Sequence, residues 1–391
     1  MTYSLKVCAS IKEIGKTHWD ACANPLLAEA DCGIPFDPFL SYDFLHALEE
    51  SESAVPQTGW APYHVVLEDD VQGVQGVMPM YLKSHSRGEY VFDYAWADAF
   101  ERAGGRYYPK LQVAVPFTPA TGRRLLTRPG SNVVELEKYL LSGAMQIAEQ
   151  VEVSSVHITF VNKEQWERMG ELGFLQRTEK QFHWFNDGYE TFEDFLGALS
   201  SKKRKNIRRE RRDARANDIE IELLQGDDIR EEHWDAFYHF YMDTGSRKWG
   251  IPYLTREFFS MIGESMADKV LLILCKRQGR YIAGAINFIG SECVFGRNWG
   301  CIEDHPFLHF EVCYYQAIEY AIANGLKRVE AGAQGPHKLA RGYLPVHTYS
   351  AHWIVNEGFR DAVNRFLDEE RQYVDEEIEI IESEHSPFRQ R

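Results

Sequence analysis

Features that would place this chain in a membrane, a secretory pathway or a zinc-binding fold are missing from its sequence. The longest strongly apolar run, Val270–Cys275, has six residues, whereas a helix needs ~20 to cross a bilayer. Met1–Cys8 lacks the apolar core of a secretory signal. The seven cysteines are an odd number and include no Cys-x-x-Cys pair, which indicates free thiols rather than a disulfide framework or a zinc knuckle. We therefore expect a cytoplasmic protein without a membrane span or a bound metal.

The chain also has fewer basic than acidic residues. Lys and Arg number 43 against 59 Asp and Glu, which gives a net charge of −16. Because a general coat of positive charge is absent, DNA is not expected as a partner, and any site for a polyanion has to be local. The fingerprints of serine hydrolases, zinc proteases, P-loop nucleotide triphosphatases and dinucleotide-binding dehydrogenases are also absent. None of these classes is supported.

What the chain does contain is an internal repeat. Its 391 residues are enough for two domains, and the tetrapeptide His-Trp-Asp-Ala occurs at His18–Ala21 and again at His233–Ala236. Each copy is followed by a helical pattern and then by two short β-branched runs that flank a turn. The two halves continue alike, and each reads β-α-α-β-β-β-α-β-α-β.

The matching segments can be given by residue. In the first half we expect a hairpin at Tyr63–Glu68 and Val74–Leu82, an extended segment at Tyr90–Trp96 and a helix at Val134–Gln150. We then expect a strand at Ser155–Val161, a short helix at Lys163–Leu172 and a last strand at Leu175–Trp184. The corresponding segments of the second half are Val270–Lys276 with Tyr281–Ile289, Cys293–Trp299, Leu308–Ala323, Lys327–Ala331, Pro336–Arg341 and Thr348–Val355.

This order of elements predicts the architecture. Three antiparallel strands followed by a crossover helix and a parallel strand make a mixed sheet with helices on both faces. The expected fold class is therefore α/β, with a mixed sheet in each of two tandem domains. We place the first domain at residues 1–185, a basic helical connector at 186–217, and the second domain, which ends in an acidic helix, at 218–391.

Three segments carry a resemblance to a known family. Lys202–Arg215 looks like the basic helix of Fem-type peptidoglycan aminoacyltransferases, and Leu308–Ile318 looks like the helix after the central hairpin of their second domain. Glu330–Pro345 resembles their strand, loop and aromatic-Lys segment, with His337-Lys338 in the place of the aromatic and the lysine. Over nearly the whole chain, the sequence is similar to the FemAB-like N-acyltransferases of bacteria, which implies two tandem acyltransferase domains of the GNAT type.

The chain departs from GNAT enzymes at the donor site. Those enzymes hold the donor's pyrophosphate in a glycine-rich loop before the crossover helix. In the second half this stretch is Gly300–Leu308, with no glycine after Gly300 and with two acids, and it is not expected to hold a pyrophosphate in that way. The first half offers Val115–Arg124, with one glycine and two arginines, which we interpret as a structural turn rather than a phosphate loop.

The basic helix allows two interpretations. Residues 202–215 carry nine Lys and Arg and two acids, for 9 − 2 = +7, whereas residues 359–384 carry three Arg and ten acids, for 3 − 10 = −7. The helix is either a solvated partner of the acidic C-terminal stretch or a phosphate site. Forked guanidiniums at helical spacing suit phosphates. The four arginines so spaced are Arg204, Arg208, Arg211 and Arg215, and we assign substrate binding to Arg204 and Arg208.

Three residues are candidate catalytic bases. Glu311 and His309 lie in the first turn of the second crossover helix, where a carboxylate also interacts favourably with the helix dipole. N-acyl transfer needs a base to take the proton of the attacking amine, and Glu or His can serve. We take Glu311 first, then His309, with His337 as the next base to test. A metal held by His305, His309 and Glu311 is disfavoured because Pro306 interrupts any shared helical face.

Further polar residues follow the strand that ends near Ala331. Gln334, Lys338 and Arg341 lie next to glycines at positions 332 and 335, and ligands commonly bind where strands of an open sheet end. Asn298 and Trp299, at the end of the preceding strand, are expected to face the same cleft. A loop of surface polar residues is the alternative.

Two functions of different classes are consistent with these residues. The first is an N-acyltransferase that moves an acyl or aminoacyl group onto an amine. By resemblance, its donor is an acyl-CoA or an aminoacyl-tRNA, its acceptor is an amine on a peptidoglycan precursor or a related metabolite, and no cofactor is tightly bound. The second is a non-catalytic protein of the same fold that binds a peptidoglycan-like or phosphorylated ligand.

Overall fold

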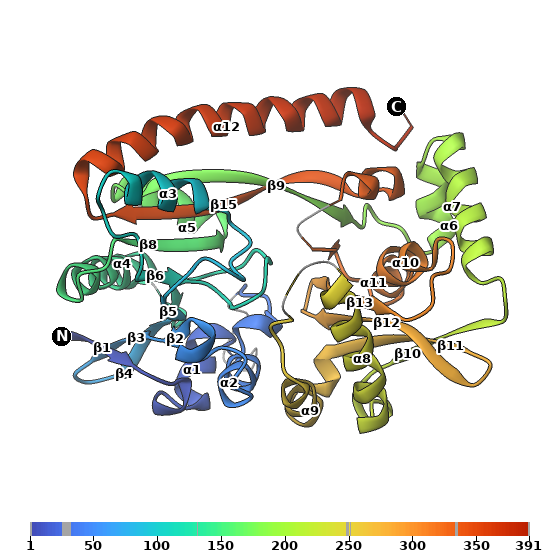
Figure 1. Ribbon diagram of the computed structural model, residues 1–391, viewed down its shortest axis with the longest axis horizontal. Coiled ribbons are helices and arrows are strands. Elements are labelled where there is room, and N and C mark those ends of the chain that lie inside the picture. Colours follow the sequence, from blue (N-terminus) through green and yellow to red (C-terminus); the bar gives the residue numbers. More distant parts are fainter. Residues whose placement is uncertain are drawn as a thin grey trace. The chain divides into compact units, whose positions relative to one another are not determined.

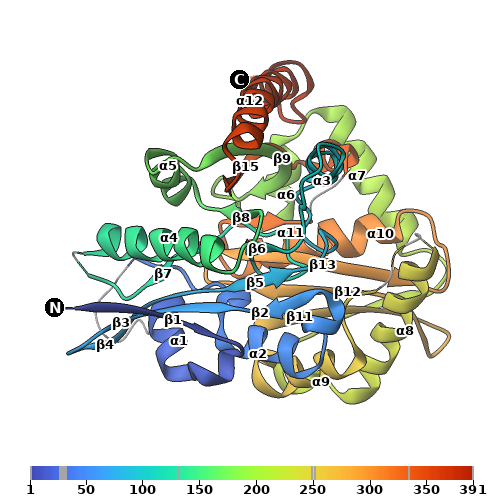
Figure 2. The same cartoon turned by 60° about the vertical axis from the view of Figure 1, so that its left-hand side comes forward.

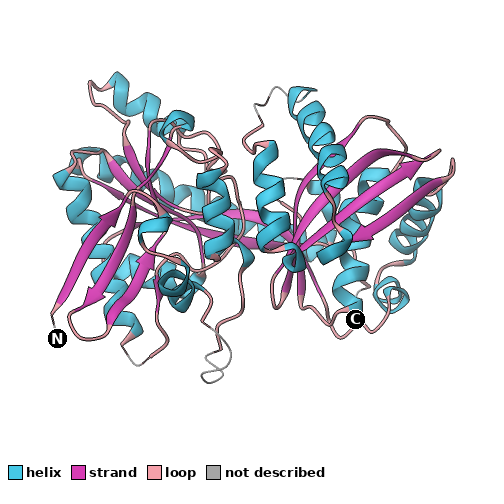
Figure 3. Ribbon diagram, turned by 90° about the horizontal axis from the view of Figure 1, so that it is seen from below, coloured by secondary structure: helices cyan, strands magenta, loops and turns pink. Residues whose placement is uncertain are grey.

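The computed structural model describes residues 2–25, 33–130, 132–247, 250, 252–332 and 335–389 (Figure 1). Two compact units divide the chain: Met1–Glu179 with His347–Glu376, and Lys180–Val346 with Glu377–Arg391. We refer to them as unit 1 and unit 2. Their boundaries fall inside strand β9 (Leu175–Phe185) and helix α12 (Glu357–His385), and within strand β15 (Leu344–Ile354). Each unit mixes helices and strands (Figure 3).

Unit 1 contains two sheets. Its elements, in chain order, are β1 (Tyr3–Cys8), α1 (Lys16–Ala23), α2 (Tyr42–Glu50), β2 (Trp60–Pro62), β3 (His64–Asp69), β4 (Gly73–Met78), β5 (Met80–Lys83), α3 (Tyr94–Arg102), β6 (Lys110–Val113), β7 (Leu126–Thr127), α4 (Val133–Gln150), β8 (Ser155–Val161), α5 (Lys163–Glu171) and the start of β9. Strands β1, β3, β4 and β7 form one sheet, whose first three strands lie side by side in Figure 2. The other sheet has the order β15-β8-β6-β5-β2, with only β6 and β8 parallel among these pairs of described strands.

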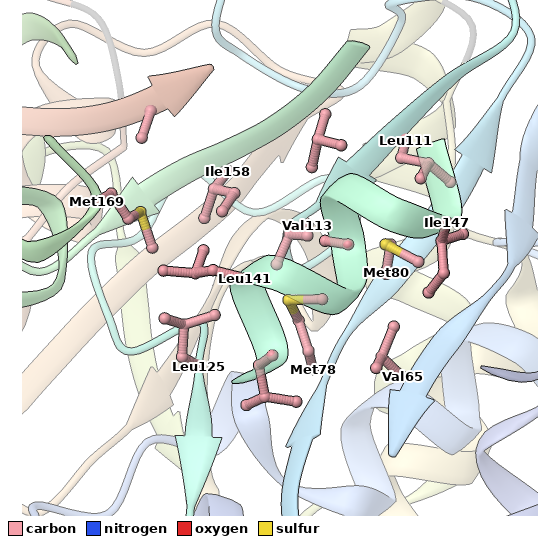
Figure 4. Close-up of a cluster of buried hydrophobic side chains, with 14 of the residues drawn as sticks. Val65, Met78, Met80, Leu111, Val113, Leu125, Leu141, Ile147, Ile158 and Met169 are labelled. Carbon is pink, nitrogen blue, oxygen red and sulfur yellow. The ribbon is translucent and has the colours of Figure 1, made fainter. Parts of the chain in front are cut away.

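Helix α4 supplies much of the core of unit 1. Its leucines and alanines, Leu136, Leu140, Leu141 and Ala144, pack against apolar residues of β3 to β6 and β8, including Met80, Leu111, Val113 and Ile158 (Figure 4). The apolar spacing along α4 is that of a helix with one buried face. A cluster of this size fixes which face of each strand is turned toward α4.

Unit 2 is built around one run of strands. Its elements are the end of β9, α6 (Phe192–Ala198), α7 (Ser201–Ala214), β10 (Ile219–Leu224), α8 (Glu231–Arg247), α9 (Arg256–Ser265), β11 (Val270–Arg277), β12 (Arg280–Ile289), β13 (Cys293–Cys301), α10 (Leu308–Phe310), a π-helical turn (Glu311–Tyr315), α11 (Gln316–Ala323), β14 (Arg328–Glu330) and a 3-10 helix (Pro336–Arg341). The strand order is β10-β11-β12-β13-β14-β9, with β13 and β14 parallel and the other pairs antiparallel.

The predicted order of elements is confirmed in the second half, whereas the first half adds strands β2 and β7 and departs from the prediction in two further places. The expected extended segment Tyr90–Trp96 is wrong: α3 begins at Tyr94, and β6 is the strand that lies parallel to the crossover partner β8. Trp96 and Ala97 are buried while their neighbours are not, which is a helical rather than an alternating pattern. The expected single strand Val74–Leu82 is divided at Pro79, which has no N–H to donate, so that β4 and β5 pair in different sheets.

Candidate active site

Strand β13 of unit 2 extends beyond its short parallel partner, β14. They pair in parallel only from Cys293 to Phe295, opposite Arg328–Glu330, and β13 then continues to Cys301. A bulge between Ile286 and Asn287 disturbs the register of the neighbouring strand at the same level. Among the described residues, the part of β13 beyond Phe295 is therefore not paired with β14. The segment that follows β14 carries the predicted substrate-binding residues.

The helix that follows β13 contains an irregular turn. Residues Leu308–Ala323 run as a short α-helix, a π-helical turn and a second α-helix. Its first turn follows Phe307, which has a left-handed φ of 64°. A π-helical turn widens the helix by one residue and commonly occurs at functional sites. Here it contains Glu311, Tyr314 and Tyr315, and it turns all three inward, since all three are buried.

The Glu311 carboxylate is fully buried and is held by Arg211 of helix α7, by Arg215 directly after that helix, and by Gln316. Its Oε1 and Oε2 atoms accept from Arg211 at 3.0 Å each, and Oε1 also accepts from Arg215 at 2.8 Å and from the Gln316 amide at 2.7 Å. Arg211 makes a second ion pair with Glu319 at 2.6 Å. The Glu311 side chain has 0% exposure. This carboxylate therefore joins α7 to the helix that carries the π-helical turn.

A second ion pair joins α7 to the 3-10 helix. Glu210 accepts two bonds from Arg341, at 2.9 and 3.2 Å, and a further one from the Tyr315 hydroxyl. The Arg341 guanidinium lies 3.5 Å from the centre of the Phe310 ring and also donates to the His337 carbonyl at 2.7 Å. Because Arg341 is buried, this pair is shielded from salt.

Aromatic and imidazole rings gather beside this scaffold. His337 is exposed, and its Nε2 lies 2.8 Å from the Tyr314 hydroxyl. The His309 ring lies 5.4 Å from Trp299, 5.4 Å from Tyr314 and 6.3 Å from His337, between ring centres. At Gly335, φ is 125°, and a Cβ there would lie 2.6 Å from the His337 ring. Glycine is required at this position for the ring to lie against the backbone.

This environment lowers the pKa values of two side chains, His337 and Lys338. Partial burial, with Arg341 and Lys338 nearby, lowers the pKa of His337 from 6.5. Its imidazole is therefore neutral at pH 7. Burial lowers the pKa of Lys338 to about 8, and its ammonium donates to the Gly332 carbonyl at 2.7 Å.

The structure brings six of the predicted site residues into this one region: Trp299, His309, Glu311, His337, Lys338 and Arg341. Asn298 lies on β13, opposite Ile286. Gln334 lies outside the described residues. Arg208 is exposed and pairs with Glu193 of α6 at 2.5 Å, and Arg204 is half-buried on the same helix.

Sequence reasoning missed how α7 is used. Of the four arginines grouped as a phosphate site, Arg211 and Arg215 bind Glu311 instead. Glu210 and Tyr314 were not singled out, although an acid within a run of basic residues was a signal that one face of the helix is buried. The disfavoured metal ligands His305 and Glu311 have other partners: His305 pairs with Glu303 at 3.0 Å, whereas Glu311 is held by arginines.

The arginines of Val115–Arg124 in unit 1 are used for structure. Arg123 donates to the Cys22 and Ala23 carbonyls, and Arg124 donates to the Ala120 and Thr159 carbonyls at 2.8 and 3.0 Å. These bonds hold a turn in place, as the sequence interpretation expects. In the part of the chain that the structure describes, no helix is both long and apolar enough to span a membrane.

The chain thus consists of two mixed α/β units, each with a crossover helix between two parallel strands or next to them. Among solved structures, FemX has a similar fold, with a TM-score of 0.54 at 12% identity over 93% of this chain and 100% of FemX. A tandem GNAT protein from the clavulanic acid biosynthesis pathway matches with a TM-score of 0.48 at 11% identity, over 91% of this chain and 99% of that protein. L-PGS from Bacillus licheniformis matches with a TM-score of 0.49 at 12% identity, over 85% of this chain and 98% of L-PGS.

The chain belongs to the FemAB-like family, described as acting in peptidoglycan biosynthesis and recognition, whose model matches residues 10–390. No curated protein matches the sequence.

Proposed function

We propose that the protein is an N-acyltransferase and that acyl transfer takes place in unit 2, beside the parallel strands β13 and β14. The observation that carries this proposal is the neutral, exposed His337 next to the buried cations Lys338 and Arg341. Acyl transfer to an amine needs a proton acceptor within reach of the amine and positive charge near the carbonyl oxygen. Membership of the FemAB-like family supports the same reaction class.

His337 is the residue we assign as the base. The amine nitrogen attacks the donor carbonyl, a C–N bond forms, the bond from the carbonyl carbon to the leaving group breaks, and the amine proton passes to the imidazole. The Tyr314 hydroxyl holds one ring nitrogen, which leaves the other for the amine. Burial raises the pKa of Tyr314, so its hydroxyl stays protonated and orients the ring without charge.

Glu311 then acts through the arginines that surround it. A base has to come within hydrogen-bond reach of the proton it takes, and the Glu311 side chain has no exposed surface. We assign it a positioning role, together with Glu210, because these two carboxylates hold α7 against the helix and loop that carry His309 and His337. His309 lines the same region through its ring contacts with Trp299 and Tyr314.

The outer side of α7 is the part of unit 2 suited to a phosphate-bearing substrate. Arg208 is largely exposed, and its one ion pair is with the equally exposed Glu193, so the interaction stabilises little and can be exchanged. We propose that Arg204 and Arg208 bind phosphates of an aminoacyl-tRNA or acyl-CoA donor, or of a nucleotide-linked cell-wall precursor that carries the acceptor amine. With a net charge of −16 on the whole chain, such docking is restricted to this helix.

A non-catalytic binding protein of the same fold is the second candidate. The enclosure of Glu311 by two arginines favours it, since the carboxylate nearest the first helical turn is used for structure. The two candidates separate in a mass-spectrometric assay. Purified protein is incubated with acyl-CoA or aminoacyl-tRNA donors and amine acceptors, and amide formation is compared between wild type and His337→Gln. Turnover that depends on His337 supports the transferase, whereas binding without amide formation supports the second candidate.

A further inference from the structure

Helix α12 carries a sequence repeat of seven residues. From position 366 the chain reads Phe-Leu-Asp-Glu-Glu-Arg-Gln, then Tyr-Val-Asp-Glu-Glu-Ile-Glu, and then Ile-Ile-Glu-Ser-Glu-His. Each copy begins with two apolar residues and continues with acids. All three copies lie within α12, which is one continuous helix (Figure 1). Because a helix makes two turns in about seven residues, corresponding residues of the copies form rows along its surface.

The two apolar rows face in different directions. In the second position of each copy, Leu367 and Val374 are buried, and Ile381 packs against a core cluster. In the first position, Phe366 is 47% exposed, Tyr373 65% and Ile380 50%. Neighbouring residues of a helix lie about 100° apart around its axis, so that one row can be buried while the other is not. We call Phe366, Tyr373 and Ile380 the outer row.

The spacing of the outer row is what requires an explanation. Single exposed apolar residues are common on protein surfaces. A row repeated every seven residues is different, because this spacing keeps apolar residues aligned with a second helix that winds along the first. Phe366 reaches the Trp96 ring, with ring centres 6.4 Å apart, whereas Tyr373 makes no ring contact among the described residues. Since the rows lie on one helix, their spacing depends on α12 alone.

The charges beside the outer row are acidic. Glu369 and Glu376 follow Phe366 and Tyr373 by three residues, which places them next to that row on the helix surface. Both are exposed, and neither forms an ion pair with another described residue. The next residue of each copy is already neutralised, since Glu370 and Glu377 pair with cations of β9. The helix therefore presents two unpaired carboxylates beside an exposed apolar row.

We propose that the outer row of α12 binds a basic amphipathic helix of a partner protein. The apolar residues of the partner pack on the outer row, and its Lys or Arg side chains pair with Glu369 and Glu376, as flanking charges do in coiled coils. Residues 359–384 carry a net charge of −7, so a basic partner is favoured by charge complementarity. This surface shares no residue with the site proposed for acyl transfer.

Other occupants fit the surface less well. A second copy of α12 would bring like charges together. A nucleic acid or an anionic membrane surface is repelled for the same reason. Helix α7 of a second copy is basic, but its apolar residues Ile207 and Ala214 are buried, so it has no apolar row to pack against the outer row.

The partner chemistry can be tested with a designed helical peptide. The probe has three heptads, with Leu at the first and fourth positions, Lys at the fifth and seventh, and Ala elsewhere. One matched peptide has Glu in place of Lys, and another has the same composition in scrambled order. Binding of each labelled peptide to the full-length protein is measured by fluorescence anisotropy. We expect the Lys peptide to bind at least about tenfold more tightly than the scrambled peptide, and the Glu peptide not to bind.

Variants of the protein test the surface itself. Tyr373→Ser with Ile380→Ser should weaken the Lys peptide by about tenfold or more, because both apolar contacts are lost. The thermal unfolding midpoint should not fall, since both side chains are exposed. Val71→Ser is the matched control: Val71 is 79% exposed between β3 and β4, and its replacement should change neither quantity. Glu369→Lys with Glu376→Lys removes no apolar contact and should reverse the preference, so that the Glu peptide binds instead.

Four results would overturn the proposal. The first is that the Lys peptide does not bind, and the second is that the scrambled peptide binds as tightly, which would show charge attraction alone. The third is that binding persists in both double variants. The fourth is that the wild-type protein sediments as a dimer that Tyr373→Ser with Ile380→Ser dissociates, which would assign the outer row to a second copy of this chain.

Discussion

Arg211 and Glu311, which are 100 positions apart in the chain, form a two-point ion pair at 3.0 Å. The carboxylate has no exposed surface, and the side chain of the arginine is only 16% exposed. Arg215 and Gln316 complete the shell around the carboxylate. The pair fixes the position of the helix that carries His309.

Replacing Glu311 with Gln should destabilise the protein, because the change leaves two guanidiniums facing a neutral amide. Breaking a buried charged pair typically costs about 3–5 kcal/mol, and partial exposure of Arg215 puts the expected loss at the lower end. Urea unfolding measures it, and Arg211→Met with the double variant gives the coupling between the two residues. If Glu311 is instead the base, as the sequence alone suggested, Glu311→Gln keeps its stability and turnover falls by ~10²–10⁴.

His337→Gln should unfold like wild type and lose ~10²–10⁴ in kcat/KM, because the substituted side chain is exposed but cannot accept the proton. The pH profile gives a second measure. Because burial and the nearby Arg341 and Lys338 lower the pKa of His337 from 6.5, kcat/KM should fall only at a pH below about 6.5, where the imidazole becomes protonated. A profile whose acid limb is unchanged in His337→Gln would assign the proton to another group.

Arg204→Glu with Arg208→Glu should weaken binding of a phosphate-bearing donor or acceptor and flatten its dependence on salt, since each phosphate contact contributes to the slope. The melting temperature should change little because Arg208 is exposed and its partner Glu193 is too. Arg211→Glu is the contrasting variant on the same helix, and it should lower the melting temperature. Unchanged salt dependence in the double variant would remove the phosphate role from α7.

Lys338 should make stability depend on alkaline pH. Its pKa is lowered by burial from 10.5 to about 8, so between these values the unfolded chain holds a proton that the folded chain has lost. Stability therefore rises with pH from about 8 to 10.5 as the cost of the buried ammonium disappears. In Lys338→Met this part of the rise should be missing, which urea unfolding at several pH values would show. An equal rise in the variant would mean that Lys338 is not the group responsible.

Much of the fold could be predicted from the sequence because it depends on local patterns. The repeat, the hairpin Val270–Lys276 with Tyr281–Ile289, and the helices at Val134–Gln150 and Leu308–Ala323 follow from the alternation or helical spacing of apolar residues, with turn residues between them. The basic and acidic helices were recognisable from charge alone. Where the pattern was ambiguous, as at Tyr90–Trp96, packing against the rest of unit 1 selected a helix.

Tertiary structure alone decided which charges meet. Nothing local distinguishes Arg211 from Arg208, yet one is enclosed with Glu311 and the other is exposed, because only one side of α7 faces the helix after β13. The same holds for Lys110 with Asp93 and for His157 with His352, which come from separate segments and meet only when the strands pair in register. Periodicity fixes which way a side chain points along its own element, whereas the partner that it finds depends on contacts between segments distant in the chain.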